Sequence, residues 1–434
     1  MTLFVECRGS GMSIVPLQQT AASRLDNMLC LQVLHNRGFS FIMETTKTKQ
    51  SITKMQKGDT TMEIIIYVGI DVHKDTYSIC CYDARTDRYL YEHKMQAKTA
   101  NVLKYLKSVK EQLGENVIFI CGYEAGPTGF GLCRDLLRED ISCVVMAPTS
   151  LKRSTGKKVK NDRVDARLLA KDLFTKDYSS VHISSQKEEA IKEFCRMRRS
   201  LSAELKNAKQ TLLSFLLRQG KVYDDGCNYW TIRHRNWLKK IQFDELYLQE
   251  AFEEYLISVN SLENRLKTVE KRLDEICEDE EVKDKVSKLV CFCGIDRLTA
   301  VSIVSEVGDF MRFGKAWHFS NFVGLTVGED SSGGREKMLG ITKAGNVYLR
   351  RLLIESVKSI KRSNPRGEKS RRLLERQEGN PPEIIAYADK CRYRLKKKLF
   401  HLESRGKHAN VATTAAAREL ACFIWGMMTD HISA

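Results

Sequence analysis

The sequence predicts an α/β domain, then long helices, then a mostly helical C-terminal domain, and three observations support this division. Short apolar runs rich in β-branched residues alternate with amphipathic stretches from residue 64 to about residue 175. Apolar residues then recur at heptad-like spacing through residues 187–290, and compact helical patterns fill the rest. The chain of 434 residues is long enough for two or three such domains.

The first element of the α/β domain is residues 64–71, an almost wholly apolar run that ends in Asp71. Its length and its β-branched content predict a strand that is buried on both faces. A carboxylate at the end of such a strand lies at the edge where open α/β sheets bind their ligands. Asp71 is therefore the first candidate site residue.

The elements that follow predict three meandering strands and then an alternation of helices and strands. Strands are expected at residues 76–82, 89–95, 117–121 and 141–146, and helices at residues 99–113 and 128–138. Thr99 is the expected N-cap of the first helix, and Gly114 is its expected stop. This order matches a ribonuclease H-like architecture better than a plain doubly wound sheet.

Three further carboxylates follow these elements. Glu124 lies in the segment GYEAGP that follows the strand at residues 117–121, and Asp162 and Asp165 lie at the start of a helix. Residues three apart on a helix share nearly the same face. We expect the apolar side of that helix to consist of Val164, Leu168 and Leu169.

In a ribonuclease H-like sheet these elements are neighbours, so the four carboxylates would converge. Without cations such a cluster would repel itself, and its pKa values would rise. Hard divalent cations such as Mg²⁺ prefer oxygen ligands, and two such ions can clamp the reacting oxygens of a phosphoryl displacement. Taken singly, each residue has an ordinary structural explanation; Asp162, for example, is also a good helix N-cap.

Residues 187–290 predict an extended helical arm for dimerisation or spacing, or else a helical subdomain that folds back on the body. Residues 293–307 resemble a helix-hairpin-helix binder of the DNA backbone, with Asp296 where a second glycine is usual.

Residues 324–335 predict a flexible loop that contains two serines. Residues 1–62 show no period, and we expect a disordered leader there. The expected domains are thus 63–185, 186–290 and 291–434.

The composition favours a polyanionic partner. The chain has 71 Lys and Arg against 55 Asp and Glu, a net charge of +16. Fourteen cysteines without a CxxC pair indicate buried thiols in a reducing cytoplasm, with neither disulfides nor structural zinc. No apolar run approaches the roughly 20 residues that span a bilayer. The expected nucleic-acid contacts are Lys152, Arg153, Lys157, Lys158, Lys160, Arg163, Arg167, Arg335, Lys343, Arg350 and Arg351.

Four motifs together resemble one known family. Residues 67–74 are YVGIDVHK, residues 123–129 are YEAGPTG and residues 161–167 are NDRVDAR. Residues 324–346 carry the glycine-rich loop and end in ITKAGN. In this order they resemble the DEDD transposases of the Piv/MooV type, which are recombinases of insertion sequences. The resemblance extends from about residue 64 to residue 425.

The resemblance implies a RuvC-like catalytic domain with a metal site formed by Asp71, Glu124, Asp162 and Asp165. It also implies a serine nucleophile in the C-terminal block, which falls on Ser332, with Ser331 as the alternative. Family members act on DNA as dimers or tetramers, and they use a structured guide RNA, the bridge RNA, to select sites. The expected location is the bacterial or archaeal cytoplasm, in association with the nucleoid.

Two other functions remain open at this point. A metal-only RuvC-like endonuclease or Holliday junction resolvase would need the carboxylates but no serine. A non-catalytic nucleic-acid-binding scaffold would need neither, and its binding would be sensitive to salt. An actin-like ATPase also begins with Gly-Ile-Asp near a strand, but the glycine-rich phosphate loops of that fold are missing from the sequence.

Overall fold

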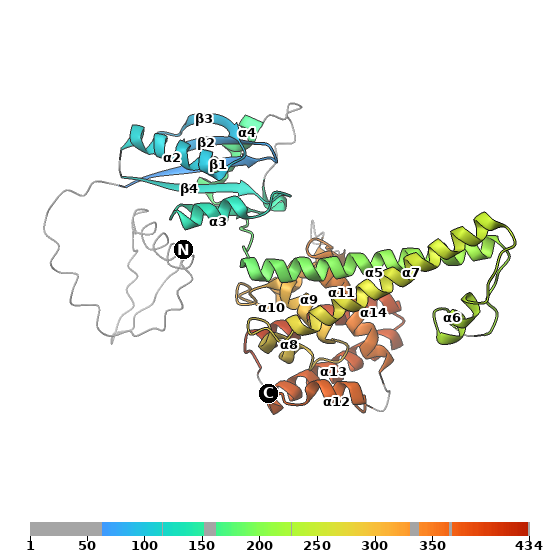
Figure 1. Ribbon diagram of the computed structural model, residues 1–434. Coiled ribbons are helices and arrows are strands. Elements are labelled where there is room, and N and C mark those ends of the chain that lie inside the picture. The colour runs from blue at the N-terminus through green and yellow to red at the C-terminus, as the bar shows by residue number, and fades with distance from the viewer. Residues whose placement is uncertain are drawn as a thin grey trace, which may run out of the picture. The chain divides into compact units, whose positions relative to one another are not determined.

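The computed structural model describes residues 63–114, 116–151, 162–226, 228–329, 338–363 and 367–432 (Figure 1). Within these ranges the chain forms two compact units. The α/β unit comprises residues 63–144 and 150–178, and the helical unit comprises residues 145–149 and 179–432. The expected leader, residues 1–62, lies outside the described residues.

The α/β unit is built on one five-stranded sheet with the strand order β3-β2-β1-β4-β5. Central strand β1 pairs antiparallel with β2 and parallel with β4. The predicted order of three strands followed by alternating helices and strands is confirmed. The strands are β1 (Ile64–Val72), β2 (Thr76–Asp83), β3 (Arg88–Gln96), β4 (Val117–Glu124) and β5 (Ser142–Met146).

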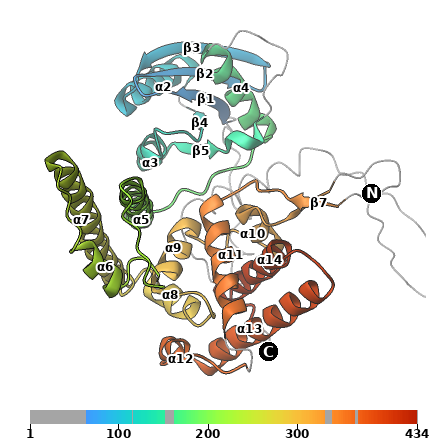
Figure 2. The ribbon, with the colours of Figure 1, turned by 90° about the vertical axis from the view of Figure 1, so that its right-hand side faces the viewer.

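Helices cover both faces of this sheet (Figures 1 and 2). Helices α2 (Thr99–Leu113) and α3 (Gly131–Arg138) lie on one face, and α4 (Asp162–Thr175) packs against β1, β2 and β4 on the other. Ile66, Val68 and Ile70 of β1 have no exposed surface. These three residues share one face of β1, whereas on the other face Gly69 is buried against α4 and Ile65 and Tyr67 are half-buried. The prediction that this strand is buried on both faces is therefore confirmed for one face and only in part for the other.

A glycine in β1 lets α4 approach the sheet closely. A Cβ added to Gly69 would lie 2.1 Å from the carbonyl oxygen of Ala166 and 2.4 Å from the amide nitrogen of Ala170. The small side chains of Ala166 and Ala170 accordingly form the buried face of α4, together with Leu169 and Leu173.

The apolar face predicted for this helix was therefore wrong in part. Leu169 is buried, but Val164 and Leu168 are each 38% exposed. The two large side chains point away because the close helix–strand contact leaves room only for alanines at its centre.

The start of α2 also differs from the prediction, while its end confirms it. The N-cap is Lys98, and Thr99 is the first helical residue. The Thr99 hydroxyl instead donates to Oδ2 of Asp135 at 2.8 Å, which ties α2 to α3. At the other end Gly114 has a φ of +106°, a conformation that glycine adopts without strain, and its N–H donates to the Lys110 carbonyl oxygen.

The helical unit contains two long helices and a compact bundle (Figure 1). Ion pairs Arg198–Glu270 and Lys209–Glu263 join the two long helices, α5 (Gln186–Arg218) and α7 (Leu246–Ile276), so these run antiparallel. Around the short helix α6 a separate apolar cluster includes Leu212, Phe215 and Phe252. The helices are α5 (Gln186–Arg218), α6 (Ile232–Leu238), α7 (Leu246–Ile276), α8 (Lys283–Leu289), α9 (Arg297–Val307), α10 (Ala316–Val323), α11 (Val347–Arg362), α12 (Arg371–Gln377), α13 (Pro382–Ser404) and α14 (Ala409–Met428).

The core of the bundle is formed around α9, in which every residue from Ala300 to Val307 is buried. Helices α10, α11 and α14 pack around this core. The cysteines that the structure describes are free thiols, and most of them are buried, as the sequence predicted. Every helix in the described part of the chain is too short or too polar to cross a bilayer.

Candidate active site

Asp71 and Glu124 lie at the adjoining carboxyl ends of two parallel strands. Ile70 of β1 pairs with Tyr123 of β4, and Asp71 and Glu124 are the next residues on each strand. Because residues alternate between the two faces of a sheet, Asp71 shares the face of Gly69, which packs against α4. The same register puts Glu124 on that face.

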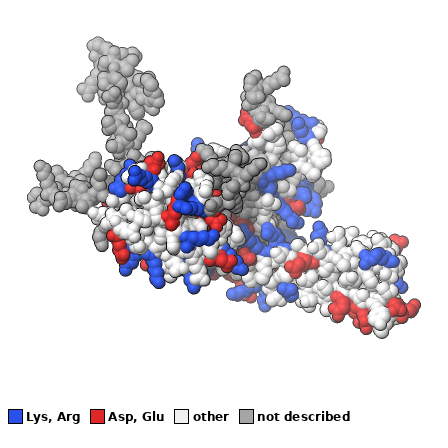
Figure 3. Space-filling model, turned by 90° about the horizontal axis from the view of Figure 1, so that it is seen from above, with Lys and Arg blue, Asp and Glu red and all other residues white. Residues whose placement is uncertain are grey.

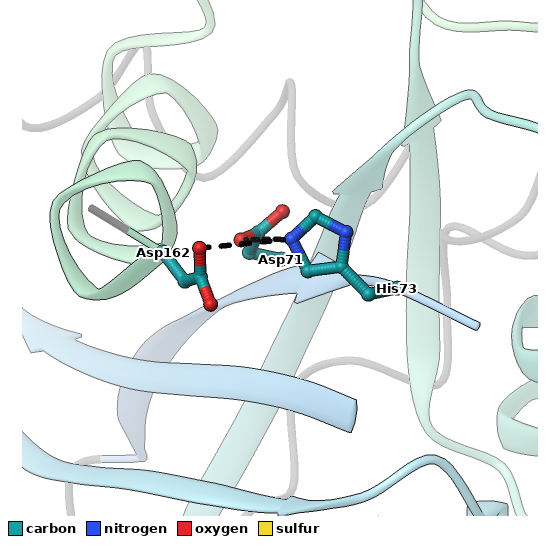
Figure 4. Close-up of side chains that lie close together, drawn as sticks. All are labelled: Asp71, His73 and Asp162. Carbon is teal, nitrogen blue, oxygen red and sulfur yellow. Dashed lines mark hydrogen bonds and ion pairs between the residues drawn. The ribbon is translucent and has the colours of Figure 1, made fainter. Parts of the chain in front are cut away.

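Helix α4 brings two more carboxylates to this edge, because its first residue is Asp162 and Asp165 follows one turn later. Ligand atoms of Asp71, His73 and Asp162 lie within 4.8 Å of one another (Figure 4). Nε2 of His73 is 3.1 Å from Oδ2 of Asp71 and 3.8 Å from Oδ1 of Asp162.

The electrostatics of Asp71 show that the carboxylates repel one another. Burial raises the pKa of Asp71, and the nearby charges of Asp165 and Asp162 raise it further, although the neighbouring His73 works in the opposite direction. Asp165 is thus near enough to act on Asp71, although it lies outside the three-residue group.

Asp162 has a cation of its own. Nζ of Lys94, on strand β3, lies 2.9 Å from Oδ2 of Asp162, and this hydrogen bond lowers the pKa of Asp162. Lys94 therefore provides positive charge, and His73 a ring nitrogen within hydrogen-bonding distance, at a position where acidic residues from β1 and α4 gather.

The donor set fits a divalent cation. Carboxylate oxygens suit Mg²⁺, and the added imidazole nitrogen of His73 also suits the transition metals. Sequence reasoning did not identify His73 or Lys94. A signal for His73 was present, because a residue two positions beyond Asp71 falls on the same face of an extended strand.

Comparison with known proteins agrees with this geometry. A sequence model of the DEDD transposases of IS110 elements matches residues 68–219, and a model of the IS116/IS110/IS902 transposase family matches residues 288–371. A putative transposase of Sinorhizobium fredii, y4qE, is 33% identical over 84% of this chain and 88% of its own length. The transposase of insertion sequence element IS1533 from Leptospira borgpetersenii is 32% identical over 79% and 98%. The chain belongs to the IS110 family of transposases. It is therefore a DNA transposase, and its substrate is DNA.

The serine block of this transposase falls partly outside the described residues. Strands β6 (Val327–Glu329) and β7 (Met338–Ile341) form an antiparallel hairpin in which Glu329 pairs with Met338. Ser331, Ser332 and Arg335 lie in residues 330–337, between these strands and outside the described residues. The basic loop with Lys152, Arg153, Lys157, Lys158 and Lys160 is also outside them.

The described basic residues of this IS110-family transposase differ in their surroundings. Arg163 and Arg167 of α4 both pair with Glu92 on β3. Arg350 donates to the Val323 carbonyl oxygen at 2.9 Å, at the end of α10.

Two further predicted contacts, Lys343 and Arg351, are exposed. On the face that Figure 3 shows, Lys and Arg are interleaved with Asp and Glu instead of forming one continuous patch. The net charge of +16 thus does not by itself locate the DNA.

Proposed function

We propose that this transposase cleaves and rejoins the DNA strands of an insertion sequence at a divalent-metal centre. Asp71, Glu124, Asp162 and Asp165 are the proposed metal ligands, and Mg²⁺ is the proposed ion. The observation that supports this proposal best is the meeting of Asp71 with the N-terminus of α4, where ligand atoms of Asp71 and Asp162 lie within 4.8 Å of each other.

The topology of the sheet supports a ribonuclease H-like, and more narrowly a RuvC-like, assignment of the catalytic domain. Three antiparallel strands are followed by two strands on the far side of β1, and β4 runs parallel to β1. Ligand sites of open sheets lie at the carboxyl ends of such parallel strands. The carboxylates are at that edge.

Each residue at the proposed metal centre would have a distinct role in phosphoryl transfer. When bound, the divalent ions would stabilise the charge on the transferring phosphate. Asp71 and Asp162, anchored on a central strand and a packed helix, would hold the ions in place. Lys94 and His73 would have to release the carboxylates, because each side chain now contacts an oxygen that would be a ligand.

Ser332 is the proposed nucleophile, with Ser331 as the alternative. Its hydroxyl oxygen would bond to phosphorus as the hydroxyl proton leaves, and the bond from phosphorus to the departing sugar oxygen would break, with that oxygen taking up a proton. The product is a phosphoserine link that a second DNA end can resolve. Support comes from the family membership and from the hairpin of β6 and β7, which flanks the serines.

We further propose that the chain works as a dimer or tetramer with a structured guide RNA, the bridge RNA, in the cytoplasm of a bacterial or archaeal cell, in association with the nucleoid. The long antiparallel pair of α5 and α7 supports an assembly role for the arm. The net charge of +16 supports the binding of more than one nucleic acid.

A covalent trapping assay tests the serine. Labelled donor DNA and guide RNA are incubated with protein and Mg²⁺, and the adduct is resolved under denaturing conditions. We expect an adduct in the wild type and in Ser331→Ala, and none in Ser332→Ala. Normal strand cleavage by both serine variants would instead support the metal-only endonuclease.

A second arm of the assay tests the carboxylates. Asp165→Asn should abolish strand cleavage while leaving nucleic-acid binding and the melting temperature close to those of the wild type. Full cleavage by this variant would show that Asp165 is not a metal ligand, and loss of folding would show that it has a structural role. Absence of cleavage in the wild type itself, with binding that is sensitive to salt, would favour the non-catalytic scaffold.

A further inference from the structure

A hollow in the helical unit, remote in sequence from the carboxylates, has a strongly basic lining. Its volume is about 620 Å³, which is in the range of pockets that hold an organic ligand. It lies among the turn before α9, the end of α11, and helices α12 and α13. Five cationic side chains line it, namely Arg362, Lys369, Arg372, Arg376 and Arg392.

The acidic groups at the hollow neutralise only part of this charge. Lys369 pairs with Asp389 at 2.5 Å. The two acidic residues in the lining are Glu368 and Asp296, and an oxygen of Asp296 accepts the N–H of Thr299 at 2.8 Å. The lining therefore keeps more positive than negative side chains.

Three of the arginines are held in place by neutral carbonyl groups. Arg376 donates to the Val290 carbonyl oxygen at 3.3 Å, and Arg362 donates to that of Lys358 at 3.3 Å. Arg392 donates to the carbonyl oxygen of Glu368 at 3.2 Å. A guanidinium that is oriented by a carbonyl keeps its full charge and has further N–H groups to donate.

Arg372 is the most available cation of the set. Among the described residues it forms no ion pair or hydrogen bond, and it lies beside Arg376 in the lining. Its neighbour Arg371 pairs with Glu375, has a side chain that is 92% exposed, and does not line the hollow. Arg372 thus has N–H groups available to a ligand in the hollow, whereas the adjacent Arg371 is paired and does not line the hollow.

The turn at the floor of the hollow is also fixed. Gly294 has a φ of +87°, and a Cβ there would lie 2.4 Å from the Ser356 carbonyl oxygen on α11. The hairpin that resembled a DNA-backbone binder is therefore packed tightly against α11, and Asp296 caps α9 at 2.8 Å. The hydrogen-bond donors at this hollow are therefore arginine side chains, and not the backbone N–H of the second glycine that is usual in such a hairpin.

We propose that this hollow binds the sugar–phosphate backbone of a nucleic-acid strand through Arg372, Arg376 and Arg392. Guanidinium groups match phosphate oxygens in paired, charge-assisted hydrogen bonds. The described lining contains no aromatic ring on which a base would stack, which favours the backbone over a free nucleotide. DNA and RNA share this phosphodiester chemistry, and the test distinguishes them.

The test compares Arg372→Gln with the matched control Arg371→Gln in the full-length protein. Fluorescence anisotropy measures the binding of labelled single-stranded DNA, duplex DNA and RNA at several salt concentrations, without divalent metal. We expect Arg372→Gln to weaken binding about tenfold and to reduce the steepness of the salt dependence by about one ion, with about twofold or less for Arg371→Gln. The strand type whose binding falls identifies the ligand.

Two results would overturn the proposal: equal affinities and salt slopes in the two variants, or displacement of the strand by millimolar AMP as effectively as by unlabelled strand. Arg376→Gln, with its melting temperature measured alongside, provides a second test if Arg372→Gln folds poorly. Because the readout is binding without metal, a failure of the proposed metal centre would leave this comparison unaffected.

Discussion

Two carboxylates of this transposase, Glu306 in the helical unit and Asp71 in the α/β unit, differ in how far their own chain neutralises them. The Glu306 side chain on α9 is 2% exposed, and it accepts hydrogen bonds from Arg196 at 2.9 and 3.1 Å and from Asn346 at 2.8 Å. The Asp71 side chain is 18% exposed and lies 3.1 Å from the imidazole Nε2 of His73, while Asp162 and Asp165 repel it.

The pKa directions follow this difference. Burial would raise the pKa of Glu306, but the hydrogen bonds from Arg196 and Asn346 outweigh it, so the pKa is lowered. The pKa of Asp71 is raised. The charge of Glu306 is neutralised by side chains of the same protein, whereas the carboxylates around Asp71 would be stabilised by additional positive charge.

The substitution Asp71→Asn should have the largest effect. It removes a proposed metal ligand and should lower strand cleavage at least about 10³-fold, since the proposed phosphoryl transfer would depend on the bound ions. Its melting temperature without metal should equal or exceed that of the wild type, because the neutral amide relieves repulsion from Asp162 and Asp165. Mn²⁺ should raise the melting temperature of the wild type but not of the variant; an equal rise in both would contradict the proposed centre.

The substitution Glu306→Ala should have the opposite profile. It removes a buried carboxylate that accepts hydrogen bonds from the half-exposed Arg196 and from Asn346, and should cost about 1.5–3 kcal/mol of unfolding free energy, measured by urea titration. Glu306→Gln, which keeps an acceptor of similar size, should cost less. If Glu306→Ala were as stable as Asp71→Asn, the contrast between the two carboxylates would be lost.

The substitution Gly69→Ala tests how closely α4 must approach the sheet. The new methyl group meets backbone atoms of Ala166 and Ala170, so we expect a loss of about 1–3 kcal/mol together with weaker cleavage, as α4 carries Asp162. Gly131→Ala is the matched control, because a Cβ at this residue of α3 meets nothing within 4 Å. It should stabilise the protein by about 0.5 kcal/mol. Equal effects of the two substitutions would refute the tight contact.

The dependence of stability on pH should show the smallest effect. With its pKa lowered on folding, Glu306 contributes stability above the ordinary carboxyl pKa, and this is lost as the pH falls through the folded pKa. Asp71 has the opposite sign, since its raised pKa makes stability fall as the pH rises through that range.

Urea titrations between pH 3 and pH 7 can separate the two signs. Glu306→Gln should weaken the loss of stability on the acid side, and Asp71→Asn should make it steeper, each by no more than about 1.4 kcal/mol per pH unit. If both variants changed the pH dependence of the unfolding free energy in the same direction, the contrast between Glu306 and Asp71 would be contradicted.

Local sequence patterns were sufficient for the order of elements in the α/β unit. The β-branched run before Asp71, the glycine stop at Gly114 and the acidic start of α4 each act within a few residues. They also predicted a strand before Glu124, although they ended it at residue 121 and the structure extends it to Glu124. The positions of Ser332 and of the basic loop stay predictions, since both lie outside the described residues.

The sequence by itself determined the order of strands and helices along the α/β unit and the strand ends near which acidic residues occur, because hydrophobic periodicity and turn residues are local properties. Only the tertiary structure decided which face of α4 is buried, since that depends on Gly69 across the contact. It alone also paired His73 with Asp71, Lys94 with Asp162 and Arg196 with Glu306. Two of these pairings join residues on different elements, and the third lies at the end of a strand. Their energies depend on burial and on neighbouring charges, which cannot be read from a single stretch of sequence.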